Sequence, residues 1–274
     1  MFRMMAVNAI TQYIDDNLET IPVDINCLVD YSGYSRRYLQ LMFKERIGMP
    51  LGRYIQLRRI TRAAVLLRLT KLPLSKIAER LFYDSQQSFT REFKKNSGYT
   101  PLQYRNNNVW SFKNMTGHLE TETMVPSPTI CCMANEEFYG TRLCYTESIP
   151  NVKTTAQTPK WIAVDTFLAE GNNILYLSHK VTPGEMDEQV NIEVIIRGRK
   201  VPADTHGSLK EGLYARFSFT GSQEEYTRFM YNVYFHSLPF YGLQRANEFD
   251  LEIISEAGDG QYVFEYYLPV YDEI

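Results

Sequence analysis

Polar side chains able to contact nucleic-acid bases are concentrated in residues 82–94, which read FYDSQQSFTREFK. Phe89 and Phe93 are four residues apart, so a helix would place both on one inward face. The polar residues outside that face are Gln86, Gln87, Ser88, Thr90, Arg91 and Lys94. Glutamine can form two hydrogen bonds with adenine, arginine two with guanine, and serine or threonine can bond several bases. An ordinary solvated helix face is the alternative, and this one helix does not decide between the two.

The same pattern occurs once more, fifty residues upstream. The matched pairs are Ser35 with Ser85, Leu39 with Phe89, Phe43 with Phe93, Lys44 with Lys94, Gly48 with Gly98 and Tyr54 with Tyr104. In each copy a short helix, a tight turn and a capped second helix follow one another, which is the helix-turn-helix arrangement. The second helix of the upstream copy exposes Arg36, Arg37, Tyr38, Gln40 and Leu41.

The net charge of −3 combines two halves of opposite sign. Residues 1–115 contain 18 basic and 9 acidic residues, a net charge of +9. The rest of the chain contains 11 basic and 23 acidic residues, a net charge of −12. A basic surface attracts polyanions and an acidic one repels them, so the halves are expected to have different partners. Together with the repeat, the positive charge favours DNA binding by the first half.

Helical periodicity runs through the first hundred residues. Apolar residues recur at helical spacing over 4–19 and 50–69, and short helices open at Pro22, Pro73 and Pro101. We expect an all-α domain in which the helix at 50–69 joins the two copies. Their second helices would then enter successive major-groove segments, about 34 Å apart.

Three segments resemble the double helix-turn-helix domain of AraC/XylS-type bacterial transcription activators: SGYSRRYLQLMFKERIG, YIQLRRITRAAVLL and FYDSQQSFTREFKKNSGYTPLQYR. The similarity covers about residues 6–106 and points to the Rob, MarA and SoxS branch. There a monomer contacts an asymmetric site through both recognition helices. The resemblance implies that the DNA readers are Arg37, Gln40, Gln86, Gln87, Ser88, Thr90 and Arg91, with Arg36 and Lys94 beside them. Arg37 stands where that branch has tryptophan and Leu41 where it has arginine, which implies a different first half-site.

The second half alternates short strands with helices. Alternating apolar residues predict strands at 138–145, 174–179, 190–197, 213–219, 249–254 and 262–270. A helix is expected around 158–169, and Ser222 and Glu225 form the capping box of another. The order strand, helix, strand, strand therefore occurs twice, which predicts an α/β domain of antiparallel sheets with a duplicated βαββ unit. We expect a multidomain chain with a DNA-binding domain at 1–110, a linker at 111–118 and the α/β domain at 119–274.

This half resembles the GyrI-like effector-binding domain, also found in Rob and in BmrR-type multidrug-responsive regulators. The similarity covers about residues 119–274 and is clearest in EYYLPV at 265–270. It implies a cleft in which a glutamate of the last strand and surrounding aromatic residues bind hydrophobic, often cationic small molecules. The matching position is Glu265, with Tyr267 on the same side of the strand.

A carboxylate flanked by aromatic rings can balance a ligand cation, whereas a solvated strand glutamate is the alternative reading of Glu265. Further candidates for the wall of the cleft are Trp161, Tyr145 and Tyr176, each of which could instead belong to an ordinary core.

The sequence predicts no metal, cofactor or catalytic site. It lacks a P-loop, a nucleophile elbow, a zinc signature and a glycine-rich dinucleotide turn. Its four histidines share no ligand spacing, and its four cysteines are expected to be reduced thiols of a cytoplasmic protein, with Cys131 and Cys132 on opposite sides of a strand. No apolar run reaches the eighteen or so residues of a membrane helix, so no membrane partner is expected.

We expect a ligand-modulated transcription activator that binds promoter DNA as a monomer. Its partners would be promoter DNA, a hydrophobic or cationic effector and, as the family resemblance implies, RNA polymerase. One alternative is a DNA-binding regulator whose second domain recruits or sequesters a protein and binds no ligand. Another is a ligand-hydrolysing enzyme, since GyrI-like folds occasionally hydrolyse their ligands, but no nucleophile or histidine pattern accompanies Glu265.

Overall fold

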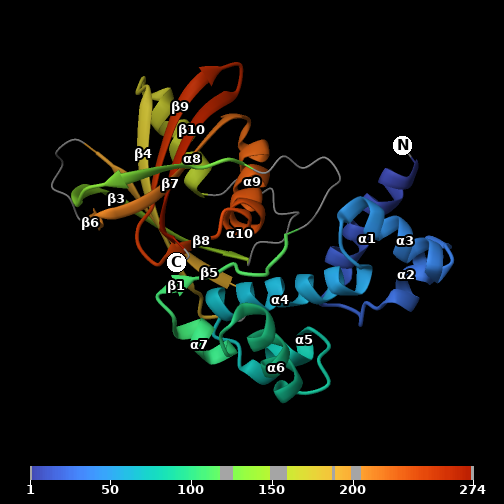
Figure 1. Ribbon diagram of the computed structural model, residues 1–274. Coiled ribbons are helices and arrows are strands. Elements are labelled where there is room, and N and C mark those ends of the chain that lie inside the picture. Colours follow the sequence, from blue (N-terminus) through green and yellow to red (C-terminus); the bar gives the residue numbers. More distant parts are fainter. Residues whose placement is uncertain (1, 118–125, 149–158, 187–188, 199–204, 273–274) are drawn as a thin grey trace. The chain divides into compact units, whose positions relative to one another are not determined.

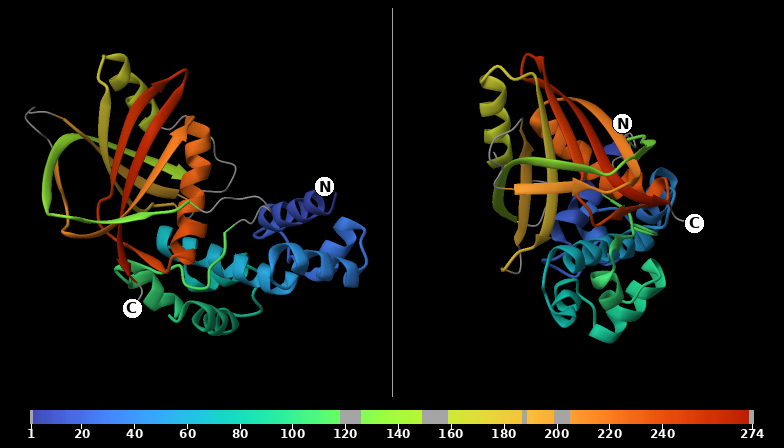
Figure 2. Two further views of the ribbon diagram at one scale, coloured as in Figure 1. Left: turned by 45° about the horizontal axis from the view of Figure 1, so that its top comes forward. Right: turned by 90° about the vertical axis from the view of Figure 1, so that its left-hand side faces the viewer.

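The chain folds into two compact units, which are drawn in Figures 1 and 2. The computed structural model describes residues 2–117, 126–148, 159–186, 189–198 and 205–272. Among these, the first unit holds 2–68, 72–107 and 112–117, and the second holds 69–71, 108–111 and everything from residue 126. The end of the predicted linker at residue 118 and the predicted start of the second domain at 119–125 lie outside the described residues.

The first unit is all-α, as predicted. Figure 1 shows two groups of three helices at opposite ends of the long helix α4. The helices are α1 (Phe2–Asn17), α2 (Ile25–Ser32), α3 (Arg36–Ile47), α4 (Leu51–Leu69), α5 (Leu74–Arg80), α6 (Gln86–Ser97) and α7 (Pro101–Asn106). Twelve residues of α4 are buried, so this helix supplies core to both groups.

The fifty-residue repeat is present in three dimensions. Helices α3 and α6 begin at Ser35 and Ser85, whose side chains each accept a hydrogen bond from a backbone N–H in the first turn. Both helices end at a left-handed glycine, with φ of 81° at Gly48 and 83° at Gly98. The matched caps therefore set the same start and the same end for the two helices.

The cores of the two copies repeat as closely as their caps. The rings of Phe43 and Tyr54 lie 5.3 Å apart between centroids, and the matching rings of Phe93 and Tyr104 lie 5.2 Å apart. All four side chains are buried. Aromatic pairs at this separation stabilise a core beyond the area they bury. Each second helix is thus fixed to its own copy by an equivalent ring pair.

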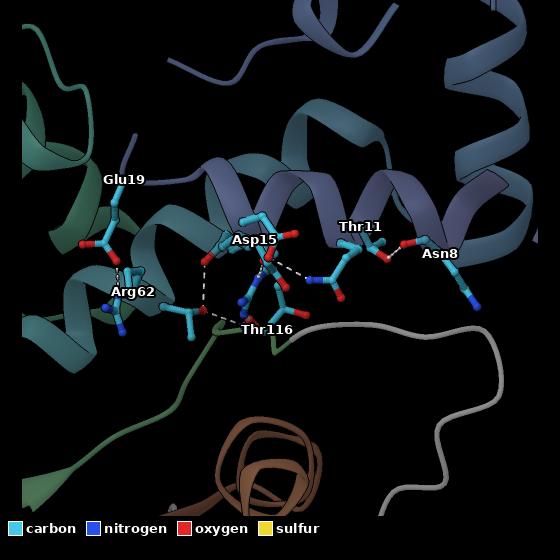
Figure 3. A network of polar contacts seen from close by, with 11 residues as sticks. Asn8, Thr11, Asp15, Glu19, Arg62 and Thr116 are labelled. Carbon is cyan, nitrogen blue, oxygen red and sulfur yellow. Dashed lines mark hydrogen bonds and ion pairs between the residues drawn. The ribbon is translucent and has the colours of Figure 1, made fainter. Parts of the chain in front are cut away.

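Ion pairs of low exposure join α1 and the residues that follow it to α4 (Figure 3). Asp15 Oδ1 lies 2.7 Å from Arg58 Nε, and both side chains are less than a tenth exposed. Glu19 pairs with Arg62 of α4 at 2.5 Å and also with Arg80 of α5. Glu19 therefore contacts both groups of helices, and these contacts help to hold α3 and α6 in one rigid unit.

A short segment after the last helix packs onto this unit. Phe112 and Met115 are buried, and the Thr116 N–H donates to the Thr61 hydroxyl at 2.9 Å. Arg58 donates to the Thr116 carbonyl at 2.7 Å. Much of the segment predicted as linker is therefore anchored to the DNA-binding unit instead of being an exposed tether.

The second unit is a ten-stranded antiparallel sheet with helices. Its strands are β1 (Val109–Trp110), β2 (Thr129–Met133), β3 (Glu136–Ser148), β4 (Ile174–Pro183), β5 (Gln189–Arg197), β6 (Thr205–Leu209), β7 (Gly212–Gly221), β8 (Leu243–Ala246), β9 (Leu251–Gly258) and β10 (Gln261–Asp272). Its helices are α8 (Pro159–Ala169), α9 (Gln223–Asn232) and α10 (Leu238–Phe240), with a π-helical turn, η1 (Val233–Ser237), between the last two.

The predicted duplication is visible in the strand order. The first copy runs β3, α8, β4, β5, and the second runs β7, α9, β9, β10, with η1, α10 and β8 inserted. The two copies meet where β4 pairs with β9. The short strands β2 and β6 are exchanged: β2, which contains the strand predicted at Cys131 and Cys132, pairs with β7 of the second copy, and β6, which was not predicted, pairs with β3 of the first. This exchange interlocks the two copies.

Helices α8 and α9 pack against the same face of the sheet. Trp161 of α8 and Tyr226 of α9 belong to one buried cluster with Leu175, Ile254 and Phe264 of the sheet. The Tyr226 and Phe264 rings are stacked, 3.9 Å apart. We call this the helix-covered face. The opposite face is partly open, since Tyr176 and Val263 are 41% and 37% exposed.

Candidate DNA-binding and ligand-binding sites

The outward face of α6 carries the predicted base readers. Phe89 and Phe93 are fully buried and fix the helix to its core. Gln86, Gln87, Arg91 and Lys94 are exposed, and Ser88 and Thr90 are half-buried on the flanks. Because these side chains share one face of an anchored helix, they form a continuous polar surface that can enter a major groove.

Helix α3 presents a different surface on the same frame. Leu39, Met42 and Phe43 are buried, whereas Arg37 and Gln40 are exposed. Leu41 is also 55% exposed, which puts an apolar side chain among the polar ones. The two remaining exposed residues of the first turn have partners within the protein: Arg36 donates to Asn26 Oδ1 at 3.4 Å, and the Arg3 guanidinium lies 5.7 Å from the Tyr38 ring.

The five predicted ligand residues lie on opposite faces of the sheet. Trp161 and Tyr145 pack in the cluster on the helix-covered face. Glu265 is opposite Ile253 across β9 and β10, and Ile253 is opposite Tyr176 across β4 and β9, so Glu265 and Tyr176 share the open face. Tyr267 lies on that face with Glu265. The candidates therefore form two groups, which one binding cleft on one face cannot combine.

Glu265 has partners within the protein. Arg216 of the neighbouring strand β7 donates to Glu265 Oε1 at 2.8 Å, and the Tyr267 hydroxyl donates to Oε2 at 2.9 Å. The side chains of Glu265 and Arg216 are 32% and 40% exposed. The Glu265 charge is thus balanced by a half-exposed guanidinium.

A second carboxylate, not singled out from the sequence, lies among the aromatic residues of the helix-covered face. Glu252 of β9 is fully buried. Its Oε2 lies 2.7 Å from Lys160 Nζ of α8 and 3.1 Å from His179 Nε2 of β4. The other ring nitrogen of His179 lies 2.9 Å from Asp250 Oδ1, and the Tyr266 hydroxyl donates to Asp250 Oδ2 at 2.5 Å. We call Glu252, Asp250, His179 and Lys160 the buried charge cluster.

The cluster shifts the pKa values of its own members. Burial would lower the pKa of His179, but the Asp250 and Glu252 carboxylates outweigh burial and raise it to about 9. Burial would raise the pKa of Glu252, but Lys160 and His179 outweigh it and lower the pKa to about 2. Near neutral pH the histidine is therefore protonated and the glutamate ionised, so the cluster contains two cations and two carboxylates.

The sequence contains one indication of the buried charge cluster. In FDLEII, Asp250, Glu252 and Ile254 alternate, so they share one side of a strand. Two carboxylates on the side of a buried isoleucine need cationic partners. The partners themselves could not be identified, because His179 and Lys160 are 71 and 92 residues away from the acids they contact.

No group of three His, Cys, Asp or Glu side chains in the described part of the chain is arranged to bind a metal ion. Within the same residues, no helix is both long enough and apolar enough to cross a membrane. The four cysteines are free thiols, and Cys131 and Cys132 both lie on β2 as predicted.

Two family models match the two units. A helix-turn-helix domain model matches residues 28–107, and the model of the GyrI-like small molecule binding domain matches residues 127–271. The first match includes both recognition helices. The second includes β2 to β9 and nearly all of β10, and therefore both copies of the duplicated unit.

Two of the similar proteins match this chain along most of its length, and a third matches less than half of it. The chain is 39% identical to the F1 operon positive regulatory protein of Yersinia pestis over 272 residues, which is 99% of this chain and 90% of that protein. It is 28% identical to the right origin-binding protein of Escherichia coli over 252 residues, 88% of this chain and 87% of the other. The multiple antibiotic resistance protein MarA of Salmonella typhimurium is 36% identical over 122 residues, 44% of this chain and 89% of MarA. The chain belongs to the AraC-type transcription regulators in which a GyrI-like small-molecule-binding domain follows the DNA-binding domain, a family of regulators and not of enzymes.

Proposed function

We propose that this protein is a cytoplasmic transcription activator that binds promoter DNA as a monomer and responds to a small hydrophobic cation. Helices α3 and α6 contact successive major-groove segments, and the sheet domain binds the effector. The observation that carries the proposal is the duplicated helix-turn-helix unit. Its two copies have matching caps and matching ring pairs, which position two helices with different polar surfaces.

Binding as a monomer is supported by the difference between the two helices. A dimer presents the same helix twice to a palindromic site. Here one chain carries both helices, with Arg37 and Gln40 on α3 and Gln86, Gln87 and Arg91 on α6. Such a chain matches an asymmetric site without a partner copy. Activation is supported by the 39% identity to a protein named as a positive regulatory protein of an operon, and contact with RNA polymerase is the means of activation that we propose.

Effector binding is assigned to the helix-covered face. Trp161 and Tyr145 lie there with Tyr226, Phe264 and the Glu252 carboxylate. Aromatic rings around a carboxylate attract organic cations, because the ring faces and the carboxylate both interact favourably with positive charge. The open face, with Glu265, Tyr176 and Tyr267, is the second candidate. Its carboxylate is less enclosed, since the Glu265 side chain is 32% exposed and Glu252 is fully buried.

In vitro transcription from a selected promoter, with and without lipophilic cations, tests the proposal. We expect promoter-dependent stimulation that changes on addition of cation. Stimulation that no compound alters, together with capture of a protein by the sheet domain, would support a protein-interaction module instead. Release of product from a bound ester would support the enzyme.

The variant Glu265→Gln separates the two faces. If the effector binds the helix-covered face, this variant leaves the affinity for cations near the wild-type value. A loss confined to cationic ligands, measured by calorimetry against neutral ligands of similar size, would move the site to the open face.

A further inference from the structure

The Lys160 side chain already occupies the position that a ligand cation would take. Its ammonium lies 2.8 Å from Glu252 Oε1 and 2.7 Å from Oε2. It also lies 4.8 Å from the centroid of the Trp161 ring and 5.4 Å from that of Tyr226. A carboxylate and two aromatic rings around one cation are the contacts by which proteins bind organic ammonium groups. Only 14% of the Lys160 side chain is exposed, so the contact is an internal one.

The Glu252 carboxylate already has two cationic partners, Lys160 and His179. An added cation would therefore gain little from Glu252 unless one of these internal cations left. Burying a charge without a partner is strongly unfavourable, so displacement needs a compensating contact.

Of the two internal cations, Lys160 is the one that can leave. The His179 backbone N–H donates to Asp250 at 2.7 Å and its Nδ1 lies 2.9 Å from the same carboxylate, while its Nε2 lies at an ion-pair distance of 3.1 Å from Glu252. Lys160 is the second residue of α8 and reaches Glu252 through a flexible four-carbon chain. Rotation about that chain moves the ammonium without moving a strand.

A second carboxylate is available to the displaced ammonium. Glu147 of β3 is partly buried, and its buried Oε1 accepts no hydrogen bond from any described residue. Burial raises the pKa of Glu147, and the positive charge of Lys160 acts in the opposite direction. Moving from Glu252 toward Glu147 would keep Lys160 paired and satisfy an otherwise unbonded oxygen.

We propose that Lys160 is a built-in competitor that occupies the effector site, and that a ligand cation binds Glu252 by displacing the Lys160 ammonium toward Glu147. This inference rests on the proposed effector site. It assigns the ligand to hydrophobic monocations, because the ligand must replace one positive charge at Glu252 and cover the rings of Trp161 and Tyr226. A neutral molecule of the same shape would leave Glu252 without its second cation.

The direct test compares the wild-type chain with Lys160→Met by isothermal titration calorimetry. The probe is benzyltrimethylammonium, an aromatic quaternary ammonium ion, and the neutral control is 2-methyl-1-phenylpropan-2-ol. Methionine keeps the aliphatic part of the side chain and removes the competing charge. We expect the cation to bind the variant at least about tenfold more tightly than the wild type, because no internal ion pair has to be broken first. The neutral compound cannot pair with Glu252, so it should bind the variant more weakly than the cation does.

Two matched variants sharpen the test. Lys160→Arg keeps the charge, so its cation affinity should stay near the wild-type value. Glu147→Gln removes the alternative partner of Lys160 without touching the aromatic contacts. It should weaken cation binding in the wild-type background and change nothing in the Lys160→Met background. That pattern is a coupling between positions 147 and 160 that a double-mutant cycle measures.

Three results would overturn the inference. One is equal affinity of wild type and Lys160→Met for the cation. Another is no cation binding to a folded Lys160→Met chain. The third is an equal effect of Glu147→Gln in both backgrounds. If Lys160→Met does not fold, as judged by tryptophan fluorescence, the other two variants test the inference. Cation binding by Lys160→Arg that is tenfold tighter than that of the wild type would then contradict it. Unchanged cation binding by Glu147→Gln would also contradict it. Binding of promoter DNA by the same samples shows separately whether the proposed regulator function holds.

Discussion

The two units pair their buried carboxylates with different cations. In the DNA-binding unit, Asp15 and Glu19 are paired with arginines, which stay protonated at every relevant pH. In the sheet unit, Glu252 and Asp250 are paired with a lysine and a histidine. Arginine pairs are planar and fixed, whereas histidine titrates and lysine moves. The first kind of pair suits a frame that must hold two helices at a constant spacing. The second suits a site whose charge can be changed by a ligand.

The largest expected effect comes from breaking the fixed kind of pair. Arg58→Met removes the guanidinium that contacts the buried Asp15 carboxylate and the Thr116 carbonyl, so the DNA-binding unit should lose about 3–5 kcal/mol of stability. Urea denaturation followed by circular dichroism at 222 nm measures the loss.

Two controls accompany this experiment. The double variant Asp15→Leu, Arg58→Met removes both charges and should recover much of the stability. Lys76→Ala breaks the exposed pair with Glu79 and should leave the unfolding curve almost unchanged. If Arg58→Met were as stable as the wild type, the ion pair between Asp15 and Arg58 would not stabilise the DNA-binding unit.

The titratable pair predicts a pH dependence in the sheet unit. The pKa of His179 is raised from 6.5 to about 9, so its contribution is complete below pH 6.5 and is lost as the pH rises through 9. The expected loss is about 3 kcal/mol. The lowered pKa of Glu252 acts on the acid side, where stability present above pH 4.5 falls as the pH drops toward 2.

Tryptophan fluorescence isolates this effect, because Trp110 and Trp161, the only two tryptophans of the chain, both belong to the sheet unit. His179→Gln should flatten the alkaline slope. A slope that persists in that variant would assign it to another group.

A smaller effect is expected on DNA binding. Arg91→Ala should weaken specific binding by about 1–3 kcal/mol, because it removes the base contact that we propose for Arg91. Lys94→Ala should weaken binding to every sequence alike and reduce the salt dependence by about one unit. Fluorescence anisotropy on specific and unrelated duplexes, over a range of salt concentrations, separates the two. If Lys94→Ala also changed sequence preference, Lys94 would have to be counted among the base readers.

The smallest effects test the symmetry of the frame. Ser35→Ala and Ser85→Ala each remove one cap, so each should cost about 1 kcal/mol of stability and the two costs should agree. Urea denaturation measures both. A much larger loss of stability in one of the two variants would show that the copies share a fold but that their caps contribute differently to stability.

Local rules made the helical unit predictable. Helix caps, the glycines that end the helices and the four-residue spacing of Phe89 and Phe93 all depend on residues that are close in sequence. The sequence alone therefore indicates them. The docking of Thr116 onto Thr61 and Arg58 was missed, because contacts between distant segments leave no periodic pattern.

The sheet unit was predictable in order but not in pairing. Its long strands and both helices follow from alternation and a capping box, whereas the exchange of β2 and β6 depends on which distant edge each short strand meets. Glu265 was predicted as a ligand-binding residue because the last strand resembles that of the GyrI-like domain. Glu252 was missed, because an acidic residue on a strand normally indicates a solvated side, and only the fold brings Lys160 to it.

We propose that two helices of one chain recognise two different half-sites. Selection from a randomised duplex library, carried out in parallel with wild type, Arg37→Ala and Arg91→Ala, tests it most directly. We predict two conserved blocks about one helical turn apart for the wild type. Arg37→Ala should relax positions in one block only and Arg91→Ala positions in the other. A single conserved block, or the same relaxed positions in both variants, would contradict the account.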